Sequence, residues 1–240
     1  MQIQPKNFSL EKTTIWSFPN RGNWATHSGQ YHGNWSPYIP RNLILRYSKP
    51  GDWILDQFVG SGTTLIESKL LNRNAIGIDI NPNAVNLTKT NLDFLYESNS
   101  RIYVFNGNAM DISKIKNQKI DFICTHPPYA DIIRYSDNLK GDISCLTIEK
   151  FLEALSFVTK ESYRVLKKNH YCSVMMGDVR KHGKVIPLGF MTMKKFLSCG
   201  FTLQEIIIKE QHNCKSTSYW EKQNSPFFLL AHEYIFVFKK

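Results

Sequence analysis

Two short stretches of this sequence combine residue types that could do chemistry. The first, called here the glycine loop, spans residues 56–64 and contains Gly60 and Gly62 directly after an apolar run. Because glycine has no side chain, a ligand can lie against the backbone there, so the loop could hold a nucleoside cofactor. The second, called here the Pro-Pro-Tyr turn, spans residues 125–129 and follows another apolar run. Its acceptors and its aromatic ring could hold a planar amine.

The glycine loop is expected to join a strand to a helix. Thr63 and Thr64 are placed to cap that helix at its amino end. Asp79 ends the next apolar run, where an acidic residue can accept hydrogen bonds from ribose hydroxyls. The spacing of the glycines differs from that of pyrophosphate-binding motifs. A simple tight turn is the alternative, and the presence of Asp56 and Phe58 in register argues against it.

The glycine loop resembles the cofactor motif of the amino-directed DNA methyltransferases, which methylate adenine N6 or cytosine N4. The pattern Asp-x-Phe-x-Gly-x-Gly-Thr-Thr carries the resemblance and implies S-adenosylmethionine as the cofactor. It implies that Phe58 and Gly60 line the methionine and ribose, that Asp56 lies near the amino-acid end, and that Asp79 binds the ribose. The cofactor-binding residues expected from the resemblance are Asp56, Phe58, Gly60, Ser61, Gly62, Thr63, Thr64, Asp79, Asn108, Ala109 and Thr125.

One cofactor position departs from this family. Its members usually carry an acidic residue after the third strand, which pairs with the adenine amine of the cofactor. Here Asn108 stands at that position, so it would offer its carbonyl oxygen instead. Asp111 is a nearby substitute.

The Pro-Pro-Tyr turn resembles the family's second motif, which activates a weak nucleophile. An aromatic amine reacts poorly because its lone pair is delocalised into the ring, and acceptors that hold its hydrogens can free that lone pair. Family members use an Asp, Asn or Ser side chain and the carbonyl of the first proline, while the last aromatic residue stacks on the flipped-out base. By resemblance, a neutral His126 and the Pro127 carbonyl accept, and Tyr129 stacks. The expected catalytic residues are His126, Pro127, Pro128 and Tyr129.

Histidine at position 126 leaves the target base open. The turn lacks an acidic residue and begins with Thr125, so it is closer to the Ser-Pro-Pro-Tyr of cytosine N4 enzymes. Cytosine N4 is therefore favoured over adenine N6. No Pro-Cys dipeptide occurs, which disfavours covalent attack by a cysteine on the base, and Cys124 is expected in the core.

These expectations describe site-specific transfer of a methyl group to the exocyclic amine of a flipped DNA base. Two alternatives stay open. Related Pro-Pro-Tyr turns serve enzymes that act on RNA or on a protein amide, although the basic charge of the chain argues against a protein amide. The unusual His126 also leaves room for an inactive partner subunit that binds the cofactor and DNA.

The formal net charge of +10 makes a polyanion a suitable ligand. The resemblance implies double-stranded DNA as the partner, with a cognate restriction endonuclease system as context. Ligands of open parallel sheets bind beyond the carboxyl ends of the strands, so basic residues after strand ends should face the substrate. Those residues are Arg134, Lys140, Arg180, Lys181 and Lys184, and the opposite edge should carry Lys160, Arg164, Lys167 and Lys168 as solvated charge. Residues 211–231 form a candidate target-recognition loop with Lys215, Tyr219 and Trp220 as further nucleic-acid residues.

The elements that must position these residues alternate between strand and helix. Strand-like runs are expected at 53–55, 75–79, 102–105, 120–125, 171–176, 202–209 and 233–238, and helices at 41–48, 64–71, 82–95, 151–166 and 187–199. This alternation predicts a mainly parallel sheet covered on both faces, with an antiparallel hairpin at the end of the chain. The resemblance implies a Rossmann-like methyltransferase fold with seven strands. Residues 1–40 should form an irregular arm, of which His32–Pro37 resembles the segment that closes over the methionine.

Composition sets the remaining bounds. A chain of 240 residues with 42% hydrophobic residues suits one α/β domain spanning 1–240. No apolar run reaches the length of a membrane span, and the first residues do not have the layout of a signal peptide, so we expect a cytoplasmic protein. The five cysteines are scattered without a Cys-x-x-Cys pair, which predicts reduced thiols and no metal site.

Overall fold

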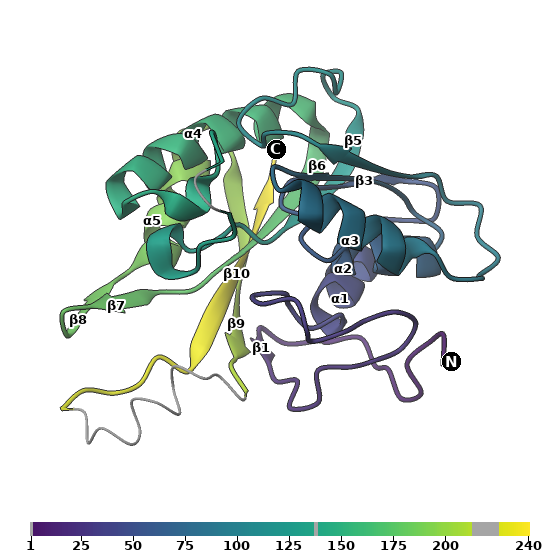
Figure 1. The fold of residues 1–240 in the computed structure, drawn as a ribbon, viewed down its shortest axis with the longest axis horizontal. Coiled ribbons are helices and arrows are strands. Elements are labelled where there is room, and N and C mark those ends of the chain that lie inside the picture. Colours follow the sequence, from purple (N-terminus) through teal and green to yellow (C-terminus); the bar gives the residue numbers. More distant parts are fainter. Residues whose placement is uncertain (1, 137–138, 213–225) are drawn as a thin grey trace.

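The computed structural model describes residues 2–136, 139–212 and 226–240 (Figure 1). Among them, eight strands form one sheet in the order β1-β9-β10-β6-β5-β2-β3-β4. These strands are β1 (Ile15–Trp16), β2 (Trp53–Asp56), β3 (Asn74–Asp79), β4 (Ile102–Asn106), β5 (Ile120–Thr125), β6 (Leu166–Met176), β9 (Thr202–Glu210) and β10 (His232–Lys239). A separate hairpin pairs β7 (Val179–Lys181) with β8 (Lys184–Ile186).

The sheet confirms the predicted α/β architecture. Strands β2 to β6 pair in parallel, while β10 runs antiparallel to both β6 and β9. All seven expected strands are present, and β1 adds a short eighth that pairs in parallel with β9. The arm is therefore not wholly irregular, because Ile15 and Trp16 extend the sheet opposite Ile208 and Lys209.

Helices cover both faces of the sheet (Figure 1). They are α1 (Tyr38–Tyr47), α2 (Thr63–Leu70), α3 (Pro82–Leu92), α4 (Ile148–Val165) and α5 (Leu188–Ser198), with short 3-10 turns at Ala130–Ile132 and Ile143–Cys145. Neighbouring residues of a strand point to opposite faces, so Leu55 of β2 belongs to the same buried cluster as Leu155 of α4, while Ile54 belongs to a second cluster with Leu43 of α1. The core thus has two layers, one on each side of the strands.

Four element boundaries differ from the expectation by three or more residues, those of α1, α3, α4 and β6, and two of the differences have identifiable reasons. Helix α1 begins at Tyr38, three residues earlier than expected, because Pro40 falls in the first turn, where a missing N–H costs nothing. Strand β6 begins at Leu166, directly after α4, because Leu166 pairs with Ile120 before the register shifts. Neither difference moves a residue of the two motifs.

A buried ionic cluster fastens the N-terminal arm to the helices. Glu67 of α2 is fully buried and accepts hydrogen bonds from the Trp24 indole (2.7 Å) and the Arg41 guanidinium (2.8 Å). His27 Nε2 lies 2.8 Å from the same carboxylate. A buried carboxylate requires such partners, so the cluster fixes where the arm crosses the molecule. It thereby positions residues 31–35 near the glycine loop.

Among the described residues, no helix is both long and apolar enough to cross a bilayer.

Candidate active site

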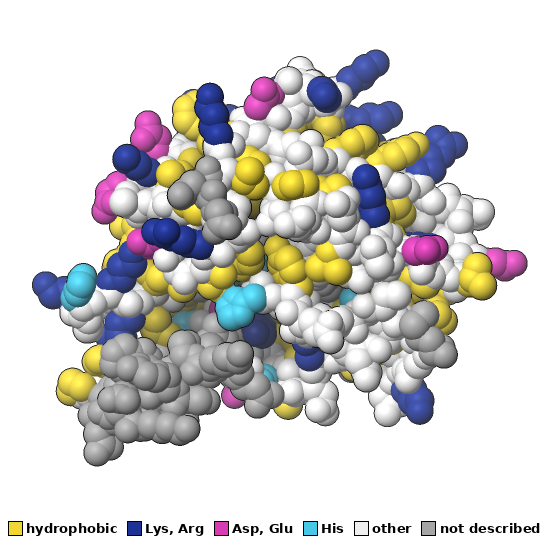
Figure 2. Space-filling view, in the orientation of Figure 1, with side chains coloured by type: hydrophobic (Ala, Val, Ile, Leu, Met, Phe, Trp, Pro, Cys, Tyr) yellow, Lys and Arg dark blue, Asp and Glu magenta, His cyan; other side chains and the backbone are white. Residues whose placement is uncertain are grey.

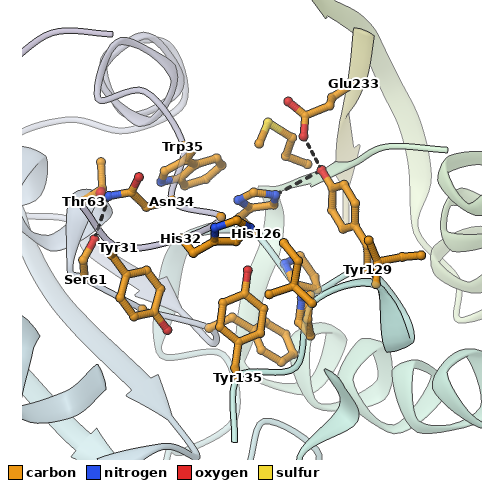
Figure 3. A pocket seen from close by; sticks show the side chains of 18 of the residues that line it. Tyr31, His32, Asn34, Trp35, Ser61, Thr63, His126, Tyr129, Tyr135 and Glu233 are labelled. Carbon is orange, nitrogen blue, oxygen red and sulfur yellow. Dashed lines mark hydrogen bonds between the residues drawn. The ribbon is translucent and has the colours of Figure 1, made fainter. Parts of the chain in front are cut away.

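A single cavity of about 1020 Å³ brings the two sequence motifs together at the carboxyl ends of the parallel strands (Figure 3). Of the expected site residues, those that line it are Asp56, Phe58, Gly60, Ser61, Thr63, Asp79, Asn108, Ala109, His126, Pro127, Pro128, Tyr129 and Arg180. Gly62, Thr64, Thr125, Arg134 and Lys181 lie outside its lining. Lys215, Tyr219 and Trp220, with most of the candidate target-recognition loop, lie outside the described residues.

The glycine loop has a backbone that only glycine adopts readily. Gly60 and Gly62 have φ angles of +52° and +86°. A Cβ at Gly62 would lie 2.8 Å from the Thr88 side chain. The Gly60 N–H donates to Asp79 Oδ2 (2.9 Å), and the Gly62 N–H donates to the Val59 carbonyl (2.8 Å). These hydrogen bonds and the glycine backbone fix the conformation of the loop.

Asp56 anchors the glycine loop through hydrogen bonds. Its buried carboxylate accepts hydrogen bonds from the Thr64 hydroxyl (2.6 Å), the Thr125 hydroxyl (2.8 Å) and the Phe58 N–H (3.1 Å). Burial raises the pKa of Asp56 to about 6, against the opposing effect of these hydrogen bonds. The expectation that threonines cap α2 is wrong: Gly62 is the N-cap, without a side-chain cap, and Thr64 bonds Asp56 instead.

Asp79 and Asn108 stand at the carboxyl ends of adjacent strands and suit a nucleoside. Asp79 accepts one hydrogen bond on each oxygen, from the N–H groups of Gly60 and Asn81 (both 2.9 Å), and each oxygen keeps a further lone pair. Asn108 Oδ1 accepts from the Met110 N–H (2.9 Å) and likewise keeps a lone pair. The apolar side chains that line this part of the cavity include Ile80, Ala109 and Ile143. Polar ends with an apolar middle fit the ribose and adenine of S-adenosylmethionine.

The N-terminal arm lies over this half of the cavity. Tyr31 stacks on Tyr135 with ring centroids 6.0 Å apart, and a Cβ at Gly60 would lie 3.0 Å from the Tyr31 ring. The Asn34 amide donates to Ser61 Oγ (3.1 Å). Figure 3 shows Tyr31, Asn34 and Ser61 on one side of the cavity and Tyr129 on the other, with His126 between them. The contacts place the arm beside the glycine loop, and its closing over the methionine stays a prediction.

His126 sits between an aromatic ring and a hydroxyl. The Trp35 ring stacks on it with centroids 5.4 Å apart, and His126 Nε2 lies 3.1 Å from the Tyr129 hydroxyl. No described residue donates a hydrogen bond to the Pro127 carbonyl oxygen. The turn therefore presents a histidine and a free carbonyl within one cavity, as an amine requires.

Burial, modified by two charged residues next to the Pro-Pro-Tyr turn, determines the protonation of His126 and Tyr129. The Tyr129 hydroxyl donates to Glu233 Oε1 (2.6 Å), and Lys209 Nζ lies 3.0 Å from Glu233 Oε2. Burial lowers the pKa of His126 to about 4, with Lys209 adding to the effect and Glu233 opposing it. Burial also raises the pKa of Tyr129 well above its ordinary value. Near neutral pH both side chains are uncharged, so His126 can accept a hydrogen bond.

The basic residues expected to contact nucleic acid differ in whether their charged groups already have partners within the protein. The Arg180 guanidinium donates to the carbonyls of Gly183 (2.8 Å) and Phe228 (3.0 Å), and Lys181 pairs with Asp131 at 2.5 Å. Arg134 is exposed beside cavity residues. Arg134 thus has the freest cation of the three.

The opposite edge carries many cations, as expected. Figure 2 shows Lys and Arg side chains along the upper side of the molecule, over α4 and the loop before β5. Arg164 there bonds Glu161 (2.7 Å), and Lys167 pairs with Asp121 at 2.5 Å. Arg164 and Lys167 are therefore held in ion pairs and are not the solvated charges that were expected, whereas Lys160 and Lys168 are exposed as expected.

Sequence reasoning missed Glu233 and Lys209. Their signal was available, because β10 runs antiparallel to the central strands and its first residues therefore lie at their carboxyl ends. Lys209 is the last but one residue of β9 and is the direct pair of Glu233. Within the described part of the chain, no group of three or more His, Cys, Asp or Glu side chains could hold a metal ion.

Comparison with known structures defines the class of fold. The solved structure of TrmN from Thermus thermophilus superimposes with a TM-score of 0.59 at 17% identity, covering 87% of this chain and 50% of that one. Together with the glycine loop and the Asp79 position, this likeness assigns a Rossmann-like methyltransferase fold.

Sequence comparison assigns the family. A family model described as DNA methylase, for N6 and N4 methyltransferases, matches residues 2–90 and 120–240. The chain therefore belongs to the amino-directed DNA methyltransferase family, and its cofactor is S-adenosylmethionine.

The names of individual relatives refer to different substrate macromolecules. The chain is 32% identical over 137 residues to release factor glutamine methyltransferase of Aquifex aeolicus, covering 53% of this chain and 47% of the relative. It is 36% identical over 125 residues to tRNA (guanine(10)-N2)-dimethyltransferase of Methanothermobacter thermautotrophicus (52% and 35% covered). It is 37% identical over 82 residues to Type II methyltransferase M.HpaI of Haemophilus parainfluenzae (34% and 26% covered). The alignments thus span less than half the length of these relatives.

Proposed function

We propose that this protein transfers a methyl group to the exocyclic amine of a flipped DNA base, with cytosine N4 favoured over adenine N6. The observation that carries the proposal is that a neutral His126 and the free Pro127 carbonyl line the same cavity as the glycine loop. Both are acceptors, and an amine has two hydrogens to donate. Bound S-adenosylmethionine supplies an activated methyl group.

The side chains act by binding and orienting. Asp79 and Asn108 hold the nucleoside part of the cofactor, and the arm at Tyr31 and Asn34 excludes water from it. Tyr129 stacks on the base, and His126 with Pro127 holds the amine hydrogens so that the nitrogen becomes pyramidal and its lone pair is no longer delocalised into the ring. Positioning and polarisation carry the catalysis in this account.

Three observations support DNA as the substrate. The matching family is described as DNA methylase, and one relative is a Type II methyltransferase. The net charge of +10 suits a polyanion. We propose further that residues 1–240 act as one domain in the cytoplasm and that residues 211–231 recognise the target. A cognate restriction endonuclease system is the proposed setting.

RNA is the second candidate, because a tRNA (guanine(10)-N2)-dimethyltransferase is among the relatives. A guanine N2 is also an exocyclic amine, so the same two acceptors would serve. A protein amide is disfavoured by the basic charge, since a neutral amide gains nothing from it.

A substrate competition tests the proposal. Purified protein, isotope-labelled S-adenosylmethionine and equal masses of unmethylated DNA, unmodified tRNA and a protein mixture are incubated together, and the label in each fraction is counted. His126→Ala is the negative variant, and Leu95→Ala, at a side chain 97% exposed, is the matched control. We expect label in DNA with the wild type and the control. Label in tRNA alone would replace the DNA proposal with the RNA one.

A further inference from the structure

A chain of four side chains ends at His126, and Figure 3 labels the last three of them, Glu233, Tyr129 and His126. Lys209 of β9 and Glu233 of β10 are directly paired residues of the sheet, and their charged groups lie 3.0 Å apart. The Tyr129 hydroxyl bridges Glu233 Oε1 (2.6 Å) and His126 Nε2 (3.1 Å). Glu233 is 8% exposed, so water competes little for its carboxylate.

The direction of these hydrogen bonds follows from counting protons. An ionised carboxylate can only accept, so the one hydroxyl proton of Tyr129 goes to Glu233. The contact between the hydroxyl oxygen and His126 Nε2 then requires a proton on Nε2. A neutral imidazole has one N–H, so Nδ1 carries a bare lone pair. No described residue bonds Nδ1, and it is not among the fully buried polar atoms that lack a partner, so it is accessible from the cavity.

We infer that Glu233, held by Lys209, is a positioning residue that acts through the Tyr129 hydroxyl to keep the proton of His126 on Nε2. This leaves Nδ1 as the acceptor for the target amine, a role that rests on the proposed function. The other tautomer would aim an N–H at the amine, which is itself a donor, and would lose the interaction. A histidine at this position therefore needs a neighbouring group that fixes its tautomer, whereas an Asp, Asn or Ser needs none.

The charges around the chain favour this arrangement. Burial alone would raise the pKa of Glu233, yet the charge of Lys209 and the hydrogen bond from Tyr129 bring it below its ordinary value. Glu233 therefore stays ionised and can only accept. The titratable groups that face His126 are Glu233, Lys209 and Tyr129, one each from β10, β9 and the turn itself.

The variant Glu233→Gln should reverse the direction of the hydrogen bonds between these four side chains while keeping the side chains in place. Lys209 can only donate, so the new amide presents its oxygen to Lys209 and its NH₂ to Tyr129. The Tyr129 hydroxyl then accepts from the amide and donates to His126 Nε2, which moves the imidazole proton to Nδ1. We expect kcat to fall on the order of 100-fold, as for loss of one preorganised group, with unchanged binding of S-adenosylmethionine. Glu205→Gln, elsewhere on β9, is the matched control.

Second variants separate this role from a purely structural one. In Tyr129→Phe the link is absent, so adding Glu233→Gln should change kcat less than about twofold further. In His126→Asn the acceptor oxygen needs no tautomer, so Glu233→Gln should again have little effect. Adding Lys209→Met to Glu233→Gln frees the amide to turn its oxygen toward Tyr129, and should recover activity. Equal losses from Glu233→Gln in all backgrounds would overturn the inference.

The tautomer can be read without any activity. Nitrogen-15 NMR of protein labelled at its seven histidines distinguishes protonated from bare ring nitrogens, and the His126→Asn spectrum identifies the signal. We expect N–H at Nε2 in the wild type and at Nδ1 in Glu233→Gln. A proton on Nδ1 in the wild type would overturn the inference. If no nucleic acid accepts methyl groups, the proposed function fails, while this spectrum still decides the tautomer.

Discussion

At the scale of single residues, His126 is set apart by its protonation. An ordinary histidine has a pKa near 6.5 and is partly charged at neutral pH, whereas burial lowers the pKa of His126 to about 4. Protonation would remove the lone pair that the proposed function requires. The pH at which His126 becomes charged therefore sets a lower limit for activity.

The first prediction concerns this limit. We expect no loss of kcat through His126 between pH 8 and pH 5.5, and a fall only as the pH approaches about 4. Initial rates of methyl transfer with saturating substrates over pH 4.5–8.5 measure it, with His126→Asn as the comparison because asparagine does not titrate. A wild-type profile that halves near pH 6.5, absent in His126→Asn, would show an ordinary histidine and contradict the account.

The same residue predicts a dependence of stability on pH. Between pH 6.5 and 4 the unfolded chain binds a proton at His126 that the folded chain does not, so the free energy of unfolding decreases as the pH falls. The lowered pKa of about 4 limits this loss to about 3 kcal/mol. Urea unfolding of the wild type and His126→Asn at pH 7 and pH 4.5 isolates it, since Asp56 titrates in both. A stability difference that does not change with pH would contradict the prediction.

At the scale of elements, the glycine loop depends on two separate constraints, backbone angle and space. Gly62 has φ +86° and a Thr88 methyl within 2.8 Å of where a Cβ would lie. Gly51 has nearly the same angle, +87°, and nothing within 4 Å. These two positions therefore separate the cost of the angle from the cost of the contact.

Gly51→Ala should cost about 1 kcal/mol of unfolding free energy, from backbone strain alone. Gly62→Ala should cost about 1 kcal/mol more, because Thr88, which donates to the Gly60 carbonyl, must move. Only Gly62→Ala should weaken binding of S-adenosylmethionine, by at least about tenfold. Urea unfolding and isothermal titration calorimetry measure both effects. Equal stability losses, or unchanged cofactor affinity in Gly62→Ala, would show that the contact with Thr88 does not matter.

The strands are the part of the structure that the sequence predicts best. Apolar runs identified all seven long strands. Burial on both faces explains the run in β5, where every residue is buried, whereas β4 and β9 have apolar residues that are exposed. The two-residue β1 was missed because its pairing with β9 depends on tertiary position rather than on its own residues. In the site, the two motifs were visible as local patterns. Glu233 was not, since its role depends on a residue 104 positions away.

At the scale of the whole molecule, this chain of net charge +10 has exposed basic residues both beside the cavity and on the loop before β5. Arg134 and Lys140 are exposed on the loop that also lines the cavity, while Lys114 and Lys116 are exposed on the loop before β5. If DNA approaches the cavity, only the first pair can neutralise phosphates. A uniformly basic surface would instead use both pairs.

We expect Arg134→Ala/Lys140→Ala to weaken DNA binding and to reduce the slope of log K against log salt by about 1 to 2. Lys114→Ala/Lys116→Ala, with the same change in charge, should leave the slope unchanged. Fluorescence anisotropy with a labelled duplex between 50 and 200 mM salt measures both. Equal slopes in the two double variants would place the DNA elsewhere.

The central claim is methyl transfer to the exocyclic amine of a base held by His126 and Pro127. The most direct measurement is mass spectrometry of the nucleosides released from unmethylated DNA after reaction with labelled S-adenosylmethionine. We expect label in N4-methylcytosine with the wild type, and none with His126→Ala. Label in N6-methyladenine would keep the reaction and change only the target base. Label in 5-methylcytosine, or undiminished label with His126→Ala, would contradict the central claim.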